Sequence, residues 1–133
     1  MVSDTLVAAA FAIFCWWLGT GAILWLDRRG GSMARWSLPF FSILMGLSFW
    51  GVSVSMAASD AAHAYLGFAS TIVMWGWHEL AFLTGCLSGP RKEPLSPGAL
   101  GWLRLRESVA VILWHELALL ANFAILVWMQ LGQ

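Results

Sequence analysis

Charged side chains are scarce in this sequence. Its 133 residues include seven basic and seven acidic side chains, so the formal net charge is zero, and 60% of the residues are hydrophobic. In a soluble domain about a quarter of the residues are charged, so the composition excludes an ordinary water-soluble globule. The lack of net positive charge also argues against nucleic acid as a partner.

Cysteine is nearly absent, and a basic N-terminal segment is missing. The two cysteines are Cys15, which we expect in the middle of one membrane span, and Cys86, which we expect at the end of another. Because they differ in depth, a disulfide between them is not expected. The first six residues contain Asp4 and no Lys or Arg, unlike the start of a signal peptide. We therefore expect a retained membrane span here.

Long apolar segments fill most of the chain. A spanning helix needs about 20 apolar residues at about 1.5 Å each, so a chain of this length holds four spans and short loops. The sequence predicts an all-α, polytopic membrane protein, a four-helix transmembrane bundle in one membrane domain of residues 1–133. We expect the spans at about residues 5–26, 37–57, 61–86 and 107–131.

The basic residues indicate how these spans are oriented. All of them fall in the first and third loops, and none lies at the termini or in the second loop: Arg28, Arg29, Arg35, Arg91, Lys92, Arg104 and Arg106. Cytoplasmic loops of membrane proteins are enriched in Lys and Arg. We therefore expect these two loops in the cytoplasm and both termini on the outer face.

A stripe of small residues on the first span is typical of close helix packing. Its members follow steps of three and four residues: Ala8, Ala12, Cys15, Gly19 and Ala22. Small side chains let membrane helices approach closely, so we expect this stripe to face protein. The second span has two weaker pairs, which ordinary composition explains equally well: Ser42 with Gly46, and Gly51 with Ser55.

One heptapeptide occurs twice. Residues 77–83 read WHELAFL on the third span and residues 114–120 read WHELALL on the fourth, with a single difference. Leucine and alanine are common in membrane helices and often repeat by chance. Three uncommon residues in the order Trp-His-Glu rarely do. The repeat predicts a site without specifying its chemistry.

The depth of the repeated residues indicates a shared site. His78 lies eight residues before the expected end of the third span and His115 eight residues after the start of the fourth, so both lie about 12 Å from the cytoplasmic end. Ionisable groups at that depth should face the bundle interior. Adjacent helical residues point about 100° apart, so a histidine is poorly placed to pair with the glutamate that follows it. We therefore expect crossed pairs, His78 with Glu116 and His115 with Glu79. Asn122 extends the polar face of the fourth span.

Three interpretations of this cluster remain open. The first is a polar clamp between two helices. The second is ligation, in which His78 or His115 serves as an axial ligand of a bacteriochlorophyll-type pigment, a haem iron or a metal ion while a carboxylate orients the ring. The third is a membrane metalloenzyme or proton-transfer site, although a di-iron centre usually has more carboxylate ligands than this cluster provides.

Several strings in the chain resemble the photosynthetic complex assembly proteins called PuhE, encoded beside the reaction-centre H subunit in purple phototrophic bacteria. The similar segments cover most of the chain: residues 17–24 with 26–27, 64–68, 75–79, 82–85, 89–91, 97–99 with 101–102, and 115–118. The chain departs from that family in length, because typical members continue through further spans beyond the position of Gln133. Any role of such a second half is left open.

The resemblance implies a role in building or stabilising the reaction centre and its light-harvesting antenna. It implies a bacterial inner, or intracytoplasmic, membrane, and it carries over no catalytic residue. The basic loops place both termini on the periplasmic side of that membrane. We expect a non-enzymatic membrane subunit or assembly factor that contacts lipid and the photosynthetic subunits and holds bacteriochlorophyll through His78 or His115. The alternative is a haem- or metal-binding membrane protein with a redox or enzymatic role.

Overall fold

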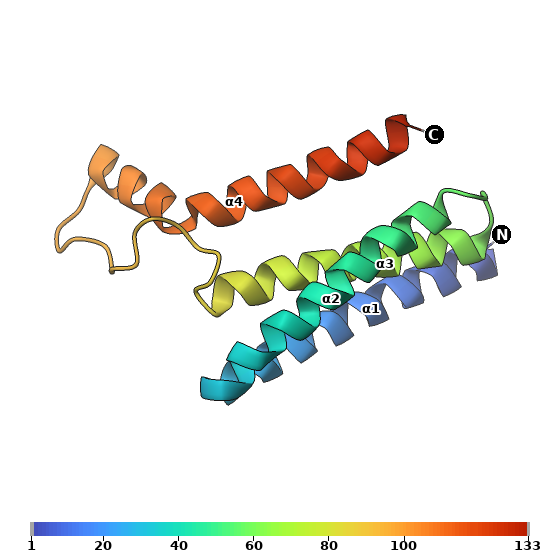
Figure 1. The fold of residues 1–133 in the computed structure, drawn as a ribbon, viewed down its shortest axis with the longest axis horizontal. Coiled ribbons are helices and arrows are strands. Elements are labelled where there is room, and N and C mark those ends of the chain that lie inside the picture. Colours follow the sequence, from blue (N-terminus) through green and yellow to red (C-terminus); the bar gives the residue numbers. More distant parts are fainter. Residues whose placement is uncertain (1, 133) are drawn as a thin grey trace.

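The computed structural model describes residues 2–132, and the side chains of these residues except 2 and 31–35. No strand occurs in this range. The structure consists of four α-helices (Figure 1): α1 (Val2–Arg29), α2 (Gly31–Ser55), α3 (Ala61–Leu83) and α4 (Gly101–Leu131). The predicted all-α, four-helix fold is confirmed.

The helix ends follow local signals in the sequence. A single residue, Gly30, joins α1 to α2, and its φ of 58° lies in the left-handed region that glycine adopts without steric cost. At the start of α3, the carboxylate of Asp60 accepts the backbone N–H of His63 at 3.0 Å, which caps the helix. Helix α3 then ends at Leu83, before the predicted end at Cys86.

Helices α2 and α3 approach closely through small residues. A Cβ atom added at Gly51 of α2 would overlap the hydroxyl of Ser70 on α3. One added at Gly67 of α3 would lie 2.8 Å from the hydroxyl oxygen of Ser55 on α2. Gly51 and Ser55 therefore lie at the interface between α2 and α3. Of the two explanations for this weaker pair, helix packing and ordinary composition, the structure favours packing.

Helix α1 packs on the other side of α3. A Cβ atom at Gly19 would meet Ile72 of α3 at 3.4 Å, and one at Gly76 of α3 would meet Ile23 of α1 at the same distance. The rings of Phe11 on α1 and Tyr65 on α3 also contact each other at a tilt, with centroids 4.6 Å apart. Within the small-residue stripe, Gly19 thus contacts α3.

The remaining stripe residues differ in exposure. Ala12 and Cys15 are half-buried, whereas Ala8 and Ala22, at the two ends of the stripe, are exposed. The part of the stripe that lies against protein is therefore its centre. That Ala8 and Ala22 also face protein stays a prediction.

Within residues 2–132, three helices are long and apolar enough to cross a membrane: Ser3–Arg29, Trp36–Ser55 and Gly101–Leu131. Helix α3 does not reach the same hydropathy, because it carries His63, His78 and Glu79 among its 23 residues. Among the side chains that the structure describes, α3 has the most buried ones, since α1 and α2 cover it. The chain is thus a membrane protein in which α1 and α2 shield the helix that carries His78 and Glu79.

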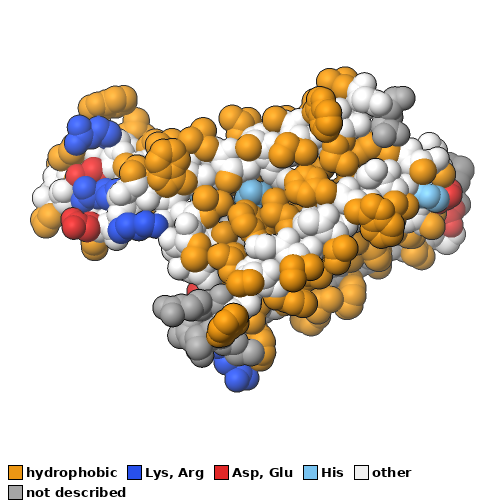
Figure 2. All heavy atoms as spheres, viewed as in Figure 1, with side chains coloured by type: hydrophobic (Ala, Val, Ile, Leu, Met, Phe, Trp, Pro, Cys, Tyr) orange, Lys and Arg blue, Asp and Glu red, His pale blue; other side chains and the backbone are white. Residues whose placement is uncertain are grey.

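The two ends of the molecule differ in charge. The N-terminus, the C-terminus and the α2–α3 turn lie at one end, and the α1–α2 junction and the loop between α3 and α4 lie at the other (Figure 1). All seven basic residues belong to the second end by their position in the sequence. Hydrophobic side chains cover much of the surface between the ends (Figure 2).

Candidate functional site

His78 is placed by the rotation of α3 about its axis. The indole N–H of Trp77, on the neighbouring position, donates to the hydroxyl of Ser42 on α2 at 2.8 Å. Because adjacent helical residues point about 100° apart, a Trp77 side chain directed at α2 turns His78 to another side of the helix. His78 is 2% exposed and packs edge-on against the Trp77 ring, with centroids 5.1 Å apart.

His115 meets His78 from α4, which runs antiparallel to α3 (Figure 1). The two imidazole centroids lie 6.4 Å apart with an interplanar angle of 79°. The ring of Phe82, one turn after His78 on α3, lies 4.7 Å from the His115 ring. The repeated motif therefore brings its two histidines together across the α3–α4 contact.

Both histidines have buried nitrogen atoms without hydrogen-bond partners. These are Nδ1 and Nε2 of His78 and Nδ1 of His115. A buried polar group normally has a partner, and each one without a partner requires an explanation. An unaccounted ligand or water molecule at this contact is one such explanation.

The two glutamates of the motif do not complete the predicted crossed pairs. Glu79 is half-buried and Glu116 is exposed. Among the described residues, no hydrogen bond or ion pair joins His78 or His115 to either glutamate. Each glutamate follows its histidine by about 100° around the helix, so when the imidazoles face each other the carboxylates turn away.

Asn122 lies farther along α4 from the histidines. Its side chain is half-buried, and its amide oxygen Oδ1 is a buried atom with no hydrogen-bond partner. It follows His115 by two turns, which keeps it on a similar side of the helix. Asn122 thus supplies a second buried polar group on α4 without contacting the imidazole pair.

The loop between α3 and α4 docks on the middle of α4. The backbone N–H of His115 donates to the carbonyl oxygen of Ser88 at 2.9 Å, and the N–H of Arg91 donates to the carbonyl oxygen of Ala110 at 3.1 Å. A Cβ atom at Gly89 would lie 2.6 Å from the carbonyl carbon of Val111, so only glycine fits between these two contacts. The loop backbone therefore enters the hydrogen-bond ladder of α4.

Helix α4 changes direction where the loop crosses it, after its first turns (Figure 1). Sharp bends in helices occur where a group inserts into the ladder of i to i−4 hydrogen bonds. The Ser88 carbonyl, bonded to the N–H of His115, is such a group. The position of the second histidine thus depends on the loop as well as on α4.

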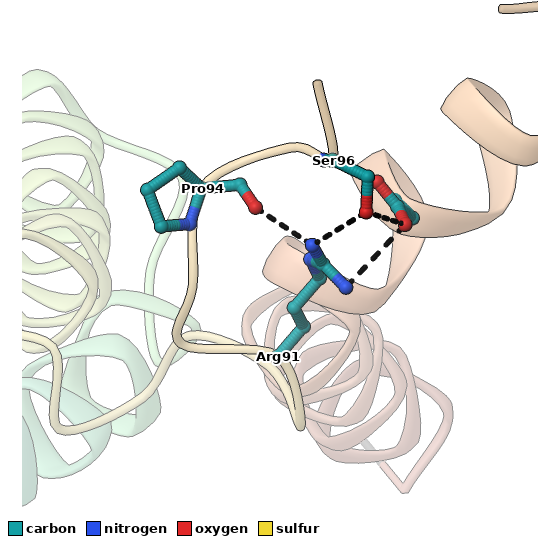
Figure 3. A network of polar contacts seen from close by, with 4 residues as sticks. Arg91, Pro94 and Ser96 are labelled. Carbon is teal, nitrogen blue, oxygen red and sulfur yellow. Dashed lines mark hydrogen bonds and ion pairs between the residues drawn. The ribbon is translucent and has the colours of Figure 1, made fainter. Parts of the chain in front are cut away.

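A polar network fixes the outer part of the same loop. The carboxylate of Glu107 is buried and accepts the backbone N–H of Ser96 at 2.9 Å and the Ser96 hydroxyl at 2.7 Å. Arg91 lies 3.5 Å from the same carboxylate and donates to the Pro94 carbonyl at 2.7 Å (Figure 3). The loop is folded around this Arg91–Glu107 pair.

Sequence analysis missed this network. It treated Glu107 as the polar start of the fourth span, whereas α4 begins earlier, at Gly101, and Glu107 is one of its few buried residues. An acidic residue inside an apolar helix, in a chain with basic residues in the preceding loop, was the available signal. Nothing in the sequence pattern marked the loop residues that pair with Glu107.

A family model described as "Protein of unknown function (DUF3623)" matches residues 2–133. The chain belongs to this DUF3623 family. No solved structure matches the DUF3623 chain.

One curated relative of this DUF3623 protein is described as an uncharacterized 30.4 kDa protein in the puhA 5' region of Rhodobacter capsulatus. It is 38% identical over 130 residues, which cover 92% of this chain and 47% of the relative. The chain therefore spans about half the length of that protein. The similarity links this chain to a relative from the puhA 5' region.

Proposed function

We propose that this DUF3623 protein is a non-enzymatic integral membrane subunit or assembly factor of the bacterial photosynthetic reaction centre and its light-harvesting complex. Three helices of spanning length and the relative in the puhA 5' region support this role. We assign no catalytic residue. The resemblance to PuhE proteins points to the same complex, and the membrane is the bacterial inner membrane.

The observation that carries the proposal is the buried imidazole pair. His78 and His115 present three buried nitrogen atoms without partners at a helix contact. Neutral imidazole nitrogen is the commonest protein ligand for metals, so these residues suit the central magnesium of a bacteriochlorophyll. The pigment would supply light absorption, while His78 or His115 would hold its metal and Phe82 would pack beside the His115 ring.

Two histidines suit a metal that is already bound in a cofactor better than they suit a bare metal ion. No group of three or more His, Cys, Asp or Glu side chains able to hold a bare metal ion occurs among residues 2–132. A structural zinc site usually takes four protein ligands. A tetrapyrrole supplies four nitrogen ligands itself and requires one or two axial imidazoles, which is what this site provides.

A haem or a metal ion held by both histidines is the second candidate function. The centroids of His78 and His115 lie 6.4 Å apart. These two imidazoles would hold the metal, and the metal would supply the redox chemistry. This candidate implies a redox role. The polar clamp loses support, because the crossed His–Glu pairs do not form.

The orientation in the membrane follows from charge. Every Lys and Arg lies at the end that holds the α1–α2 junction and the α3–α4 loop. We place that end in the cytoplasm and both termini in the periplasm, because short basic loops are retained inside. An alkaline phosphatase fused after Gln133 is then active, and an inactive fusion contradicts this orientation.

The absorption spectrum of the full chain, purified from a phototrophic host together with metal analysis, tests the proposal. Near-infrared pigment bands support bacteriochlorophyll binding, and a Soret band with redox-sensitive α and β bands supports haem. Pigment bands should be lost in whichever of His78→Leu and His115→Leu removes the ligand, whereas a haem held by both histidines should be lost in each variant. His63→Leu is the matched control, because it removes a histidine at the other end of α3 and should keep them.

A preparation without pigment, haem or metal would overturn the ligand-binding part of the proposal. The subunit or assembly role is tested separately by deleting the gene in a phototrophic host. We expect less assembled reaction-centre and light-harvesting complex in the membranes. Unchanged complex levels would contradict that role.

A further inference from the structure

A cavity of about 460 Å³ lies at the basic end of the molecule, apart from the histidines. The loop between α3 and α4 forms one wall of it, and the first turns of α4 form the other. Its lining includes three basic side chains, Arg91, Lys92 and Arg106, and two acidic ones, Glu93 and Glu107. The cavity therefore combines a net positive lining with a position at the end of a spanning helix.

Hydrogen bonds within the loop leave part of this positive charge without an acceptor. Arg91 and Ser96 already satisfy the Glu107 carboxylate. The Nε–H of Arg91 is buried and has no hydrogen-bond partner. The Arg91 guanidinium thus keeps one N–H without an acceptor.

Lys92 and Arg106 add donors on either side of Arg91. The ammonium of Lys92 donates to the Gly85 carbonyl at 2.7 Å and to the Ser88 hydroxyl at 2.6 Å, and it has a third proton left. The side chain of Arg106 makes no hydrogen bond or ion pair with the rest of the described chain. These groups together offer charged donors to an anion that carries several oxygen atoms.

The surroundings of the cavity are those of a membrane interface. The first turns of α4 expose large apolar side chains between the basic ones, with Trp102 77% exposed, and Leu103 and Leu105 also exposed. Tryptophan is enriched at the level of lipid headgroups. Figure 2 shows charged side chains at this end directly beside hydrophobic ones. An anion held here would have apolar surface next to it for acyl chains.

We propose that this cavity binds the phosphate group of an anionic phospholipid, with Arg91, Lys92 and Arg106 as its donors and the exposed face at Trp102 and Leu103 beside its acyl chains. Basic pockets at the cytoplasmic side of membrane helices bind the headgroups of anionic lipids. The site is independent of the function proposed for the histidines. Its loop wall contacts α4 at Ala110, so bound lipid would reinforce the fold of the loop.

Lipid retention by the full chain tests the site. The protein is reconstituted in nanodiscs of phosphatidylcholine with phosphatidylglycerol, and the lipid that remains bound after transfer to detergent is counted by native mass spectrometry. We expect phosphatidylglycerol to be retained over phosphatidylcholine. Arg106→Gln should lower retention about fivefold, the factor for one basic residue next to an anionic lipid surface.

Arg104→Gln is the matched control. It removes the same charge from the same helix, but Arg104 does not line the cavity, so retention should change less than twofold. Equal losses in the two variants would overturn the proposal, because they would indicate general surface attraction. Retention of both lipids to the same extent would overturn it as well.

Inorganic phosphate distinguishes the two sources of this chemistry. A lipid site should keep its phosphatidylglycerol in the presence of millimolar phosphate, because the acyl chains contribute to binding. Complete displacement of the lipid by phosphate would overturn the lipid assignment and indicate a site for a free anion. Binding that persists in Lys92→Gln/Arg106→Gln would overturn the assignment of these donors.

Discussion

The backbone N–H of His115 donates to the carbonyl oxygen of Ser88 at 2.9 Å, so the α3–α4 loop is attached to α4 at the residue whose ring faces His78. One residue thus takes part in two contacts. Its side chain meets α3, and its backbone meets the loop that begins where α3 ends. Changes in the loop are therefore expected to reach the imidazole pair without any direct contact to it.

Gly89→Ala tests the docking of the loop on α4. A Cβ atom at this position would come within 2.7 Å of the Val111 carbonyl oxygen and also overlap that of Ala110, so the loop must move away. We expect the free energy of unfolding in detergent to fall by about 1–3 kcal/mol, the usual cost of overpacking. The measurement is a thermal or denaturant melt of the purified protein.

Gly46→Ala is the control for that change. A Cβ atom at Gly46 meets nothing within 4 Å, and the residue lies inside α2. It should leave the stability unchanged or raise it by up to about 1 kcal/mol, because alanine is the better helix former. Equal destabilisation by both substitutions would contradict the close contact at Gly89.

Glu107→Gln tests the network that folds the loop. The amide keeps the size of the side chain but replaces a carboxylate oxygen, which accepts from Arg91 or Ser96, by a donor. We expect trypsin to cleave after Arg91 or Lys92 about tenfold faster, because hydrogen bonds to charged groups are the stronger ones. Glu93→Gln makes the same chemical change at an exposed position of the loop and should leave the cleavage rate nearly unchanged.

Gly51→Ala tests the close approach of α2 and α3. The added methyl group would overlap the Ser70 hydroxyl, so we expect a loss of about 1–3 kcal/mol in the free energy of unfolding. Ser70→Ala removes the obstructing oxygen. In the double variant the loss caused by Gly51→Ala should largely disappear, and a double-mutant cycle measures this coupling. Additive effects would show that the two residues do not meet.

Acidification tests the cap of α3. The pKa of Asp60 lies below its ordinary value of 3.8, first because the backbone N–H of His63 donates to the carboxylate and second because the His63 ring does. The ionised carboxylate therefore stabilises the folded state at pH values above 3.8, and this contribution disappears as the pH falls through the lowered pKa. NMR titration of the Asp60 carboxyl carbon should report that lowered value.

Two substitutions separate the cap from the charge. Asp60→Asn retains an N-cap acceptor and should keep the start of α3 protected from hydrogen exchange without a pH dependence. Asp60→Ala should increase exchange at His63 at every pH. Equal protection in all three proteins would argue against the cap.

Local sequence patterns determined the helices. Apolar length and the scarcity of charge placed four helices, and Gly30 and Asp60 marked ends that the structure contains. The repeat at residues 77–83 and 114–120 also pointed to the helix pair whose histidines meet. These features are readable because hydropathy, turns and caps depend on residues close together in the chain.

The tertiary structure alone decided which side of each helix faces its neighbour. The bond between Trp77 and Ser42 orients α3, and with the imidazoles facing each other the glutamates turn away, so the crossed pairs that the sequence suggested do not form. The pairing of Glu107 with loop residues depended equally on contacts between distant segments. Such contacts set the rotation of each helix and the docking of the loop. The spacing of residues within a single helix does not report them.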